Sequence, residues 1–251
     1  MSETQPFLQV KNIYKSFGHV EALRGVNMEA YTGEVLALVG DNGAGKSTLI
    51  KTLSGAVWPD CGEIWLNNQK YSRLKPKQAI KIGLSTVYQD LALANTRDVP
   101  CNIFMGRELR CGILLNKKAM YTEAQKLIGN LGIKIPSLAV PVSILSGGQR
   151  QGVAVARAIH QGGKILIFDE PTAAMGLVES AAVLKLIKNL AEQGFGVIII
   201  SHNLEQVFQV ANRVCVMRQG KVVNTVRTAD VCAQDVVSMI TGALETNSNL
   251  N

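Results

Sequence analysis

Short, nearly uniform apolar runs separate longer stretches with helical periodicity along this chain. The apolar runs at 35–39, 84–88, 165–168 and 197–200 have the length of single strands. A strand that is covered on both faces needs apolar residues at nearly every position, which is typical of parallel sheets. The pattern therefore predicts an α/β fold whose core is a mostly parallel sheet.

The N-terminal part of the chain follows a different pattern. Residues 7–10 and 26–30 alternate in part between apolar and polar positions, and residues 63–66 form another short apolar run. Partial alternation of this kind indicates strands with one face on the core and one face toward solvent. We therefore expect an antiparallel β flank ahead of the parallel core.

Helical periodicity dominates the middle of the chain and returns at its end. Between residues 90 and 162, apolar positions recur with helical spacing at 99–106, 117–131 and 148–158. After the last core strand the pattern predicts strands at 214–217 and 221–226 and a helix at 229–240. The final residues, about 243–251, are expected to form a disordered tail.

Length and composition fit one globular domain. A chain of 251 residues can bury a sizeable core, and no internal repeat or low-complexity linker divides it. We expect a core of about residues 5–89 and 163–242, with an inserted helical subdomain of about 90–162. Although 47% of the residues are hydrophobic, no apolar run approaches the roughly 18 residues of a membrane span. Residues 1–10 also lack the features of a secretion signal.

The net charge indicates which classes of ligand to expect, and the cysteine spacing indicates the state of the thiols. A formal net charge of +7 suits a polyphosphate ligand and a membrane surface rich in anionic lipid. The same charge would suit nucleic acid, but the basic residues are scattered and no basic run is longer than Lys117-Lys118, so no nucleic-acid partner is expected. Five widely spaced cysteines without a CxxC pair indicate reduced thiols rather than a zinc site.

One glycine-rich segment matches a phosphate-binding loop in full. It reads Gly40-Asp41-Asn42-Gly43-Ala44-Gly45-Lys46-Ser47-Thr48 and fits the pattern G-x-x-x-x-G-K-[ST]. A predicted strand precedes this phosphate loop and a helical pattern follows it, which is the arrangement that directs backbone N–H groups at phosphates. We expect Lys46 to reach the β- and γ-phosphates of a nucleotide and the Ser47 hydroxyl to bind Mg²⁺.

A second glycine loop, Leu145-Ser146-Gly147-Gly148-Gln149, lies at the start of the predicted helix at 148–158. Glycines lack a Cβ and let backbone N–H groups approach a phosphate closely, and the helix N-terminus adds a positive partial charge. Two phosphate sites in one chain predict that two copies face each other head to tail and that two chains share each nucleotide.

The apolar run at 164–168 ends in two carboxylates, Asp169 and Glu170. Asp169 is a candidate for holding Mg²⁺, usually through water, because hard cations prefer oxygen ligands. Glu170 is a candidate for polarising an attacking water. A solvated acidic strand end is the alternative interpretation, and the preceding phosphate loop makes it the weaker one.

Together these three motifs resemble the ATP-binding cassette (ABC) family, the nucleotide-binding subunits of ABC transporters, over about residues 7–242. The resemblance implies a P-loop ATPase core, with ATP and Mg²⁺ as cofactors and residues 145–149 as the signature loop of that family. It also implies that Phe17 stacks on adenine, with Tyr14 as a nearby competitor. Gln89 matches the glutamine that touches Mg²⁺ and the water and faces the membrane partner, and His202 matches the switch histidine.

The resemblance assigns roles in hydrolysis, which would depend mainly on positioning and charge stabilisation. Glu170 would activate the water, and His202 would hold the water and the γ-phosphate in line. Magnesium would be held by Ser47, Gln89 and Asp169. Ser146 and Gly148 of the partner chain would cap the γ-phosphate. Intact Glu170 and His202 argue against a module that holds ATP without hydrolysing it.

Gly176 departs from the family pattern. After Glu170-Pro171-Thr172 the family usually has Ser-Ala-Leu-Asp, whose aspartate helps to couple the two ATP sites, whereas this chain has Ala173-Ala174-Met175-Gly176. The residues expected to bind Mg²⁺ and to position the water still match the family pattern. We therefore expect looser coupling between the sites rather than loss of hydrolysis.

Segments 87–93, 98–108 and 170–174 are similar to the single-cassette fructose/ribose/xylose-type importers of bacteria. That resemblance implies import of a monosaccharide by a homodimer or heterodimer of ATPase subunits. The dimer would bind integral membrane permease subunits at the cytoplasmic face of the inner membrane, with an extracytoplasmic sugar-binding protein as an indirect partner. Another cargo, export, or a soluble ABC ATPase that acts on nucleic acid are the open alternatives.

Overall fold

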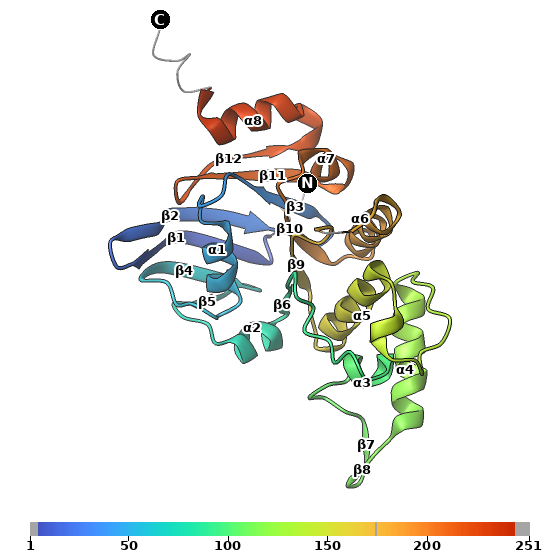
Figure 1. Ribbon diagram of the computed structural model, residues 1–251. Coiled ribbons are helices and arrows are strands. Elements are labelled where there is room, and N and C mark those ends of the chain that lie inside the picture. Colours follow the sequence, from blue (N-terminus) through green and yellow to red (C-terminus); the bar gives the residue numbers. More distant parts are fainter. Residues whose placement is uncertain (1–4, 174, 244–251) are drawn as a thin grey trace, which may run out of the picture.

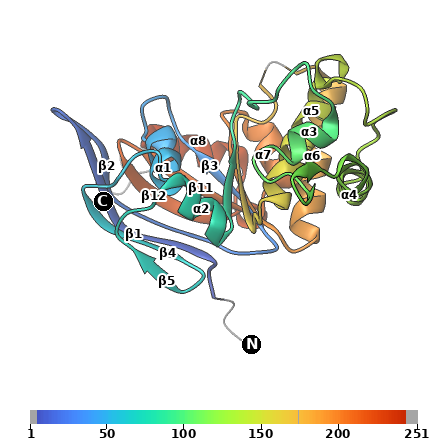
Figure 2. The same cartoon turned by 90° about the horizontal axis from the view of Figure 1, so that it is seen from below.

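Two β-sheets and a helical part build the fold (Figure 1). The computed structural model describes residues 5–173 and 175–243. Seen from below, the antiparallel sheet and the helical part lie at opposite ends of the molecule (Figure 2). This architecture confirms the predicted α/β class with an antiparallel β flank and an inserted helical part.

The antiparallel sheet has the strand order β2-β1-β4-β5. β1 pairs with β2 from Leu8 opposite Ala30 to Phe17 opposite Val20, and its other edge pairs with β4. The predicted flank is therefore confirmed, although its first two strands are much longer than the runs at 7–10 and 26–30. The strands are β1 (Leu8–Phe17), β2 (Val20–Ala30), β4 (Cys61–Leu66) and β5 (Gln69–Tyr71).

The second sheet is mostly parallel and has the order β12-β11-β3-β10-β9-β6. All neighbouring pairs are parallel except β11 and β12, which are antiparallel. The four predicted core strands are confirmed, and β11 extends the parallel part. The strands are β3 (Val35–Val39), β6 (Leu84–Val87), β9 (Ile165–Asp169), β10 (Gly196–Ile200), β11 (Arg213–Arg218) and β12 (Lys221–Arg227).

This parallel sheet separates two hydrophobic cores. On β3, Leu36 and Leu38 belong to the core shared with the antiparallel sheet, while Val35, Ala37 and Val39 belong to the core on the other face. Successive side chains of a strand point to opposite faces, so both faces must be apolar. This explains why the core strands are uniformly hydrophobic in the sequence.

Helices cover both faces of the parallel sheet. On the side of the antiparallel sheet, Leu49 and Leu53 of α1 and Ala79 of α2 enter the core. On the opposite side, apolar residues of α5, α6, α7 and α8 fill the other core. These helices are α1 (Lys46–Leu53), α2 (Pro76–Ile82), α5 (Gly147–His160), α6 (Leu177–Glu192), α7 (Leu204–Val210) and α8 (Ala233–Thr241).

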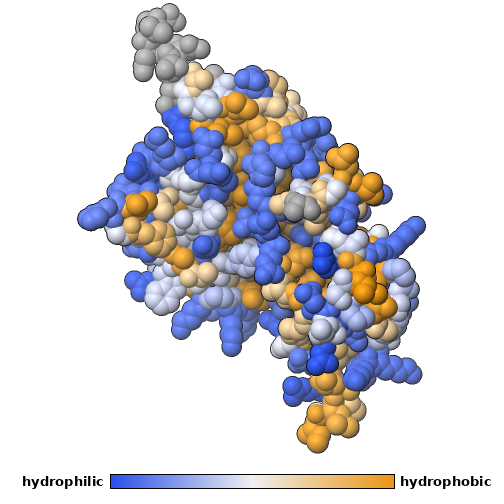
Figure 3. All heavy atoms as spheres, viewed as in Figure 1, coloured by the Kyte–Doolittle hydropathy of each residue, from blue (hydrophilic) through white to orange (hydrophobic). Residues whose placement is uncertain are grey.

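The helical part contains α3 (Val99–Ile103), α4 (Lys117–Asn130) and a 3₁₀ turn (Val142–Ile144) before α5. The helix predicted at 99–106 begins as expected, where Asp98 Oδ1 accepts from the Cys101 N–H at 2.8 Å, but it ends three residues early. A small hairpin of β7 (Arg110–Cys111) and β8 (Leu114–Leu115) follows. The exposed side chains of Ile113 and Leu114 give this hairpin the apolar tip visible in Figure 3.

The C-terminal prediction needs one correction. The helix expected at 229–240 begins only at Ala233, because a 3₁₀ turn (Thr228–Asp230) intervenes and the Cys232 N–H donates to Asp235 Oδ2 at the start of α8. The predicted disordered tail falls, apart from Ala243, outside the described residues. None of the described helices combines the length and the hydropathy needed to cross a membrane.

Candidate functional site

Three predicted site residues and the phosphate loop follow strands that end at the same edge of the parallel sheet. In the strand register, Ile200 pairs with both Leu38 and Asp169, and Val87 pairs with Phe168. Carboxyl ends of parallel strands meet at one edge, which is where α/β proteins bind ligands. The phosphate loop directly follows β3, and Glu170 directly follows β9. Gln89 comes two residues after β6, and His202 comes two residues after β10. The topology therefore brings these segments together.

The glycines of the phosphate loop are required by its geometry. Gly45 has a φ of +101°, and a Cβ at this position would lie 2.6 Å from the carbonyl oxygen of Ala22 on β2. Gly40 has a φ of +151°, and a Cβ there would collide with the Met217 carbonyl oxygen. A residue with a side chain would have to displace neighbouring backbone at both places. The loop is therefore held tightly between β2 and β11.

Lys46 starts helix α1, and its ammonium group folds back over the loop. Its Nζ donates to the carbonyl oxygens of Gly40 at 2.6 Å and Asp41 at 3.0 Å. The pKa of Lys46 is lowered, chiefly by burial. The negative charges of Glu170, Asp41 and Asp169 offset part of this shift. The charges of Asp169 and Glu170, at and directly after the end of β9, thus act on this lysine. Ser47 and Thr48 follow in the first turn of α1.

Asp169 is a desolvated carboxyl group beside a second carboxylate. Burial raises the pKa of Asp169 above its ordinary value of 3.8, the neighbouring charge of Glu170 raises it further, and Lys51 and Lys46 lower it. The two lysines therefore do not compensate for the burial. A divalent cation would supply the missing positive charge, and the Ser47 hydroxyl, the Gln89 amide and Asp169 offer the oxygen ligands that Mg²⁺ prefers. The residues present fit this metal.

Glu170 and His202 are in direct contact. The Nδ1 atom of His202 lies 3.0 Å from Oε1 of Glu170. Glu170 has a φ of +50°, which is uncommon for a residue with a side chain. Its backbone N–H donates to the Ile200 carbonyl oxygen at 3.0 Å, which holds this conformation. Strained conformations of this kind cluster at functional sites.

The two candidate adenine-stacking residues lie near the turn of the β1–β2 hairpin, where Phe17 pairs with Val20. The side chains of Phe17 and Tyr14 are 51% and 49% exposed. The Phe17 ring carries the Lys15 ammonium 5.4 Å from its centroid, whereas the Tyr14 ring packs on the backbone of Gly25. Phe17 is thus the freer of the two rings, and its stacking role stays a prediction.

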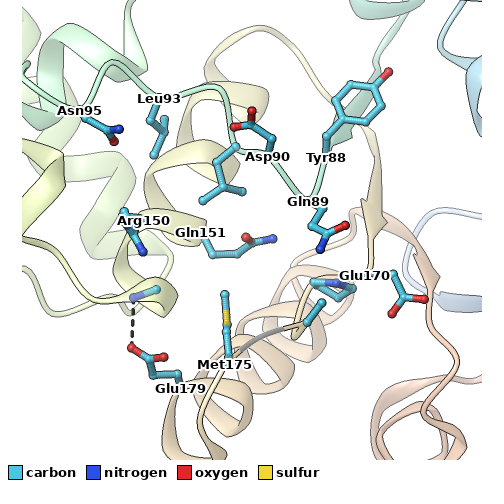
Figure 4. A pocket seen from close by; sticks show the side chains of 14 residues that line it. Tyr88, Gln89, Asp90, Leu93, Asn95, Arg150, Gln151, Glu170, Met175 and Glu179 are labelled. Atoms are coloured by element: carbon cyan, nitrogen blue, oxygen red, sulfur yellow. Dashed lines mark hydrogen bonds between the residues drawn. The ribbon is translucent and has the colours of Figure 1, made fainter.

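Gln89 lines a pocket between the parallel sheet and the helical part (Figure 4). Other lining residues include Glu170, Met175 and, from α5, Arg150 and Gln151. The pocket thus joins the segment after β6, the end of β9 and the first turns of α5.

Arg157 of α5 fixes the segment that follows Gln89. Its guanidinium donates to the carbonyl oxygens of Leu91 at 2.6 Å and Ala92 at 2.8 Å. Burial lowers the pKa of Arg157, and two backbone acceptors compensate for part of that burial. The sequence analysis missed this residue, although an arginine in an otherwise apolar helical pattern is a usable signal.

The signature loop, residues 145–149, forms the start of α5. The Ser146 hydroxyl accepts from the Gln149 N–H at 3.3 Å, and Gln149 Oε1 accepts from the Ser146 N–H at 3.0 Å, which is a reciprocal helix cap. A Cβ on Gly148 would meet its nearest atom, the Glu179 carbonyl oxygen, only at 3.7 Å. Gly148 is also absent from the positions with positive φ. The described part of the chain therefore does not itself require glycine at 148.

The signature loop is separated from the phosphate loop of the same chain. Helix α1, which begins at the phosphate loop, lies beside the antiparallel sheet, whereas α5 lies in the helical part in both views (Figures 1 and 2). The structure thus brings Lys46, Asp169, Glu170 and His202 together, lines one pocket with Gln89 and Glu170, and leaves Ser146 and Gly148 in another region. Their shared use of one nucleotide stays a prediction.

The chain is similar to ATP-binding subunits of sugar importers. The model of the ABC transporter family matches residues 23–173. The xylose/arabinose import ATP-binding protein XylG of Sulfolobus acidocaldarius is 45% identical over 93% of both chains, and the fructose import ATP-binding protein FrcA of Rhizobium meliloti is 43% identical over 96% of both. The ribose import ATP-binding protein RbsA of Yersinia pestis is 39% identical over 94% of this chain, which spans 46% of that protein.

Solved structures agree in fold. The structure of cbiO1 of Clostridium perfringens, part of the ABC transporter complex cbiONQ, has a TM-score of 0.77 and 28% identity over 92% of both chains. The dimeric bacterial ABC transporter cassette MJ0796 has a TM-score of 0.73 and 23% identity over 88% of this chain and 98% of that one. Motifs, fold and relatives agree: the chain belongs to the ABC transporter family and is one of its ATPase subunits.

Proposed function

We propose that this ATPase subunit energises the import of a monosaccharide through a membrane permease, and that two copies share each ATP. One observation carries the shared site. Glu170 and His202 touch each other at the sheet edge where the phosphate loop begins, while Ser146 and Gly148 lie in the helical part of the same chain. A second chain in head-to-tail orientation would bring its signature loop to the first chain's nucleotide.

Binding of ATP falls to the phosphate loop and the hairpin end. Backbone N–H groups of residues 40–48 surround the phosphates, and Lys46 releases its bonds to Gly40 and Asp41 to reach the β- and γ-phosphates. Phe17, with its exposed ring, stacks on adenine. Since Lys46 is already desolvated, its charge acts strongly on a bound phosphate.

Hydrolysis depends on the contact between Glu170 and His202. Glu170 accepts hydrogen bonds from the attacking water and polarises it. His202 keeps that carboxylate in place and holds the γ-phosphate in line. Magnesium, when bound at Ser47, Asp169 and Gln89, neutralises the charge that develops on the phosphate oxygens. The signature loop of the partner chain adds the Ser146 hydroxyl and the Gly148 N–H as preorganised donors.

The pocket lined by Gln89 is where we expect nucleotide state to reach the permease. It connects Glu170 with α5, and Arg157 ties the segment after Gln89 to the same helix. Movement of α5 would therefore move this segment too. The permease would dock here at the cytoplasmic face of the membrane.

The assignment of a sugar as cargo is supported by the relatives. XylG, FrcA and RbsA carry import of xylose or arabinose, fructose and ribose in their names. The proposed site would contact nucleotide and permease rather than cargo, so the class of cargo, and not one sugar, is proposed. An extracytoplasmic sugar-binding protein would deliver the sugar to the permease.

A pull-down from membranes tests the proposal. Tagged Glu170→Gln protein would be expressed in its own host and recovered from detergent-solubilised membranes with ATP and Mg²⁺, with Lys46→Ala as the matched control. We expect a multi-span permease to accompany the Glu170→Gln protein, with a sugar-binding protein bound or encoded beside it. Recovery from the soluble fraction with nucleic acid or ribosomes would contradict the transport assignment.

A further inference from the structure

Glu179 makes a hydrogen bond that joins two parts of the candidate site. The backbone N–H of Gly147, in the signature loop, donates to Oε1 of Glu179 at 3.1 Å (Figure 4). Glu179 lies in the first turn of α6, and Gly147 lies in the first turn of α5. The first N–H groups of a helix have no acceptor within their own helix, so Glu179 satisfies a donor of α5 from a neighbouring helix.

Gly147 lies close to the side chains of Glu179 and Met175. A Cβ built on Gly147 would lie 3.3 Å from Oε2 of Glu179 and 3.5 Å from Cε of Met175. A Cβ here would be in ordinary contact with the thioether and would require a slight shift of the carboxylate. The signature loop therefore packs directly against the segment that runs from Glu170 into α6.

That segment is short and bonded to itself. The Ala173 N–H donates to the Glu170 carbonyl oxygen at 3.1 Å, and the Met175 N–H donates to that of Thr172 at 3.3 Å. The hydroxyl of Thr172 also donates to Oε1 of Gln206 in α7 at 2.6 Å. These hydrogen bonds tie the described residues between Glu170 and Met175 to one another and to α7.

Glu179 is the first charged residue after Glu170 in the sequence. Gly176, which precedes α6, has no side chain, and a Cβ there would meet nothing within 4 Å. Glycine at 176 therefore provides no side-chain contact between this segment and the signature loop. The carboxylate of Glu179, one turn further on, makes that contact.

We propose that Glu179 is a positioning residue that ties the signature loop to the catalytic segment of the same chain. The inference rests on the proposed function, in which Glu170 serves the chain's own ATP while Ser146 and Gly148 serve the partner's ATP. A change at Glu170 on hydrolysis then reaches the opposite ATP through the hydrogen bond from Gly147 to Glu179. The two sites of the dimer are coupled by this contact.

An ordinary structural role is the competing explanation. An acidic residue in the first turn stabilises its own helix by interaction with the helix dipole, and Glu179 fulfils that condition in α6. This role requires negative charge, whereas the proposed tie requires a hydrogen-bond acceptor. Glutamine keeps the acceptor and removes the charge, and alanine removes both.

The test compares Glu179→Ala, Glu179→Gln and, as a control, Glu192→Ala, which removes an exposed acid from the last turn of the same helix. Hydrogen–deuterium exchange without nucleotide would follow the amide of Gly147, and steady-state ATPase would give the Hill coefficient for ATP. We expect exchange at Gly147 to be about tenfold faster in Glu179→Ala, with the Hill coefficient falling toward 1. Glu179→Gln and Glu192→Ala should retain wild-type values in both measurements.

Several outcomes would overturn the inference. These are wild-type exchange at Gly147 in Glu179→Ala, equal losses in Glu179→Gln and Glu179→Ala, and a Hill coefficient of 1 in the wild-type protein. A folded wild-type protein without ATPase activity would contradict the proposed function instead. The exchange measurement needs no nucleotide and would still decide whether Glu179 holds the signature loop.

Discussion

Oε1 of Glu170 lies 3.0 Å from Nδ1 of His202, although 32 positions separate the two residues in the sequence. Parallel pairing of β9 and β10 places Asp169 opposite Ile200, so the residues that follow each strand meet at the sheet edge. The strand register therefore brings the pair together. Side chains that the fold holds in place favour catalysis by positioning.

Replacement of Glu170 by glutamine should separate binding from hydrolysis. The amide keeps the shape of the side chain and its contact with His202 but is a poor acceptor for the proton of water. We expect ATP affinity to stay within about twofold of wild type and hydrolysis to fall about 10²–10³-fold, the usual effect of removing one such group. Phosphate release and nucleotide binding measure the two quantities. Hydrolysis at the wild-type rate would remove Glu170 from the mechanism.

Replacement of Lys46 by alanine should act earlier, at binding. The ammonium group is desolvated and held over the phosphate loop by the carbonyl oxygens of Gly40 and Asp41, so its loss removes a strong phosphate ligand. We expect ATP affinity to fall about 10-fold or more, since charge-assisted hydrogen bonds contribute roughly 1.5–3 kcal/mol. Titration with a fluorescent ATP analogue measures this. Lys188→Ala, which removes an exposed lysine of α6, should bind normally.

Replacement of Asp169 by asparagine should stabilise the nucleotide-free protein while it impairs hydrolysis. The pKa of Asp169 is raised in the folded state, chiefly by burial, so the folded protein binds more protons than the unfolded chain just above pH 3.8. The contribution of this group to stability is present below that pH and is lost as pH rises through the raised pKa. At neutral pH the ionised carboxylate therefore lowers the stability of the folded protein, and asparagine removes this destabilisation.

Melting temperatures at pH 7 and pH 4 measure this effect. Asp169→Asn should melt higher than wild type at pH 7, and the difference should shrink at pH 4. Glu192→Gln, at an exposed carboxylate, should show no such pH-dependent gain. A lower melting temperature for Asp169→Asn at pH 7 would contradict the burial argument. Added Mg²⁺ with ATP should reverse the order, because the metal compensates for the wild-type carboxylate.

Replacement of Gly176 by aspartate should change cooperativity without harming the fold. Gly176 is the N-cap residue of α6 and has an extended conformation, with a φ of −69° that any residue can adopt. Aspartate is favoured at an N-cap and should stabilise the protein by a few tenths of a kcal/mol relative to glycine. We expect an altered Hill coefficient for ATP hydrolysis with a slightly higher melting temperature. Unchanged cooperativity would count against the idea that Gly176 loosens the coupling.

The strands and the phosphate-site motifs could be predicted because their causes are local. Uniform burial of β3 and β10 requires apolar residues at every position, and the phosphate loop requires glycine at 40 and 45. Such constraints leave a signal in short windows of sequence. The same holds for the start of α5, whose serine and glutamine cap each other.

Features that depend on side-chain hydrogen bonds or on contacts between separate segments could not be predicted in this way. Buried Asn102 holds residues 94–98 with hydrogen bonds to Ala94, Arg97 and Asp98. A hydrophobic pattern does not predict such a hydrogen-bond network. The early end of α3 and the β7–β8 hairpin belong to the same region. The sequence analysis also assigned no element to α2, α6 or α7. The contact of Glu179 with Gly147 joins two helices 32 positions apart in the chain, so only the fold reveals it.

The most direct measurement concerns the central claim that two chains share each ATP. Glu170→Gln protein, alone and combined with Gly148→Asp, would be analysed by sedimentation with and without ATP and Mg²⁺. A Cβ at 148 makes only ordinary contacts, and an acidic residue suits a helix N-terminus, but the charge of an aspartate repels a γ-phosphate. We predict an ATP-dependent dimer for Glu170→Gln and, for the combined variant, a monomer that still binds ATP. A dimer of equal stability in the combined variant, or no ATP-dependent dimer with Glu170→Gln, would contradict the shared site.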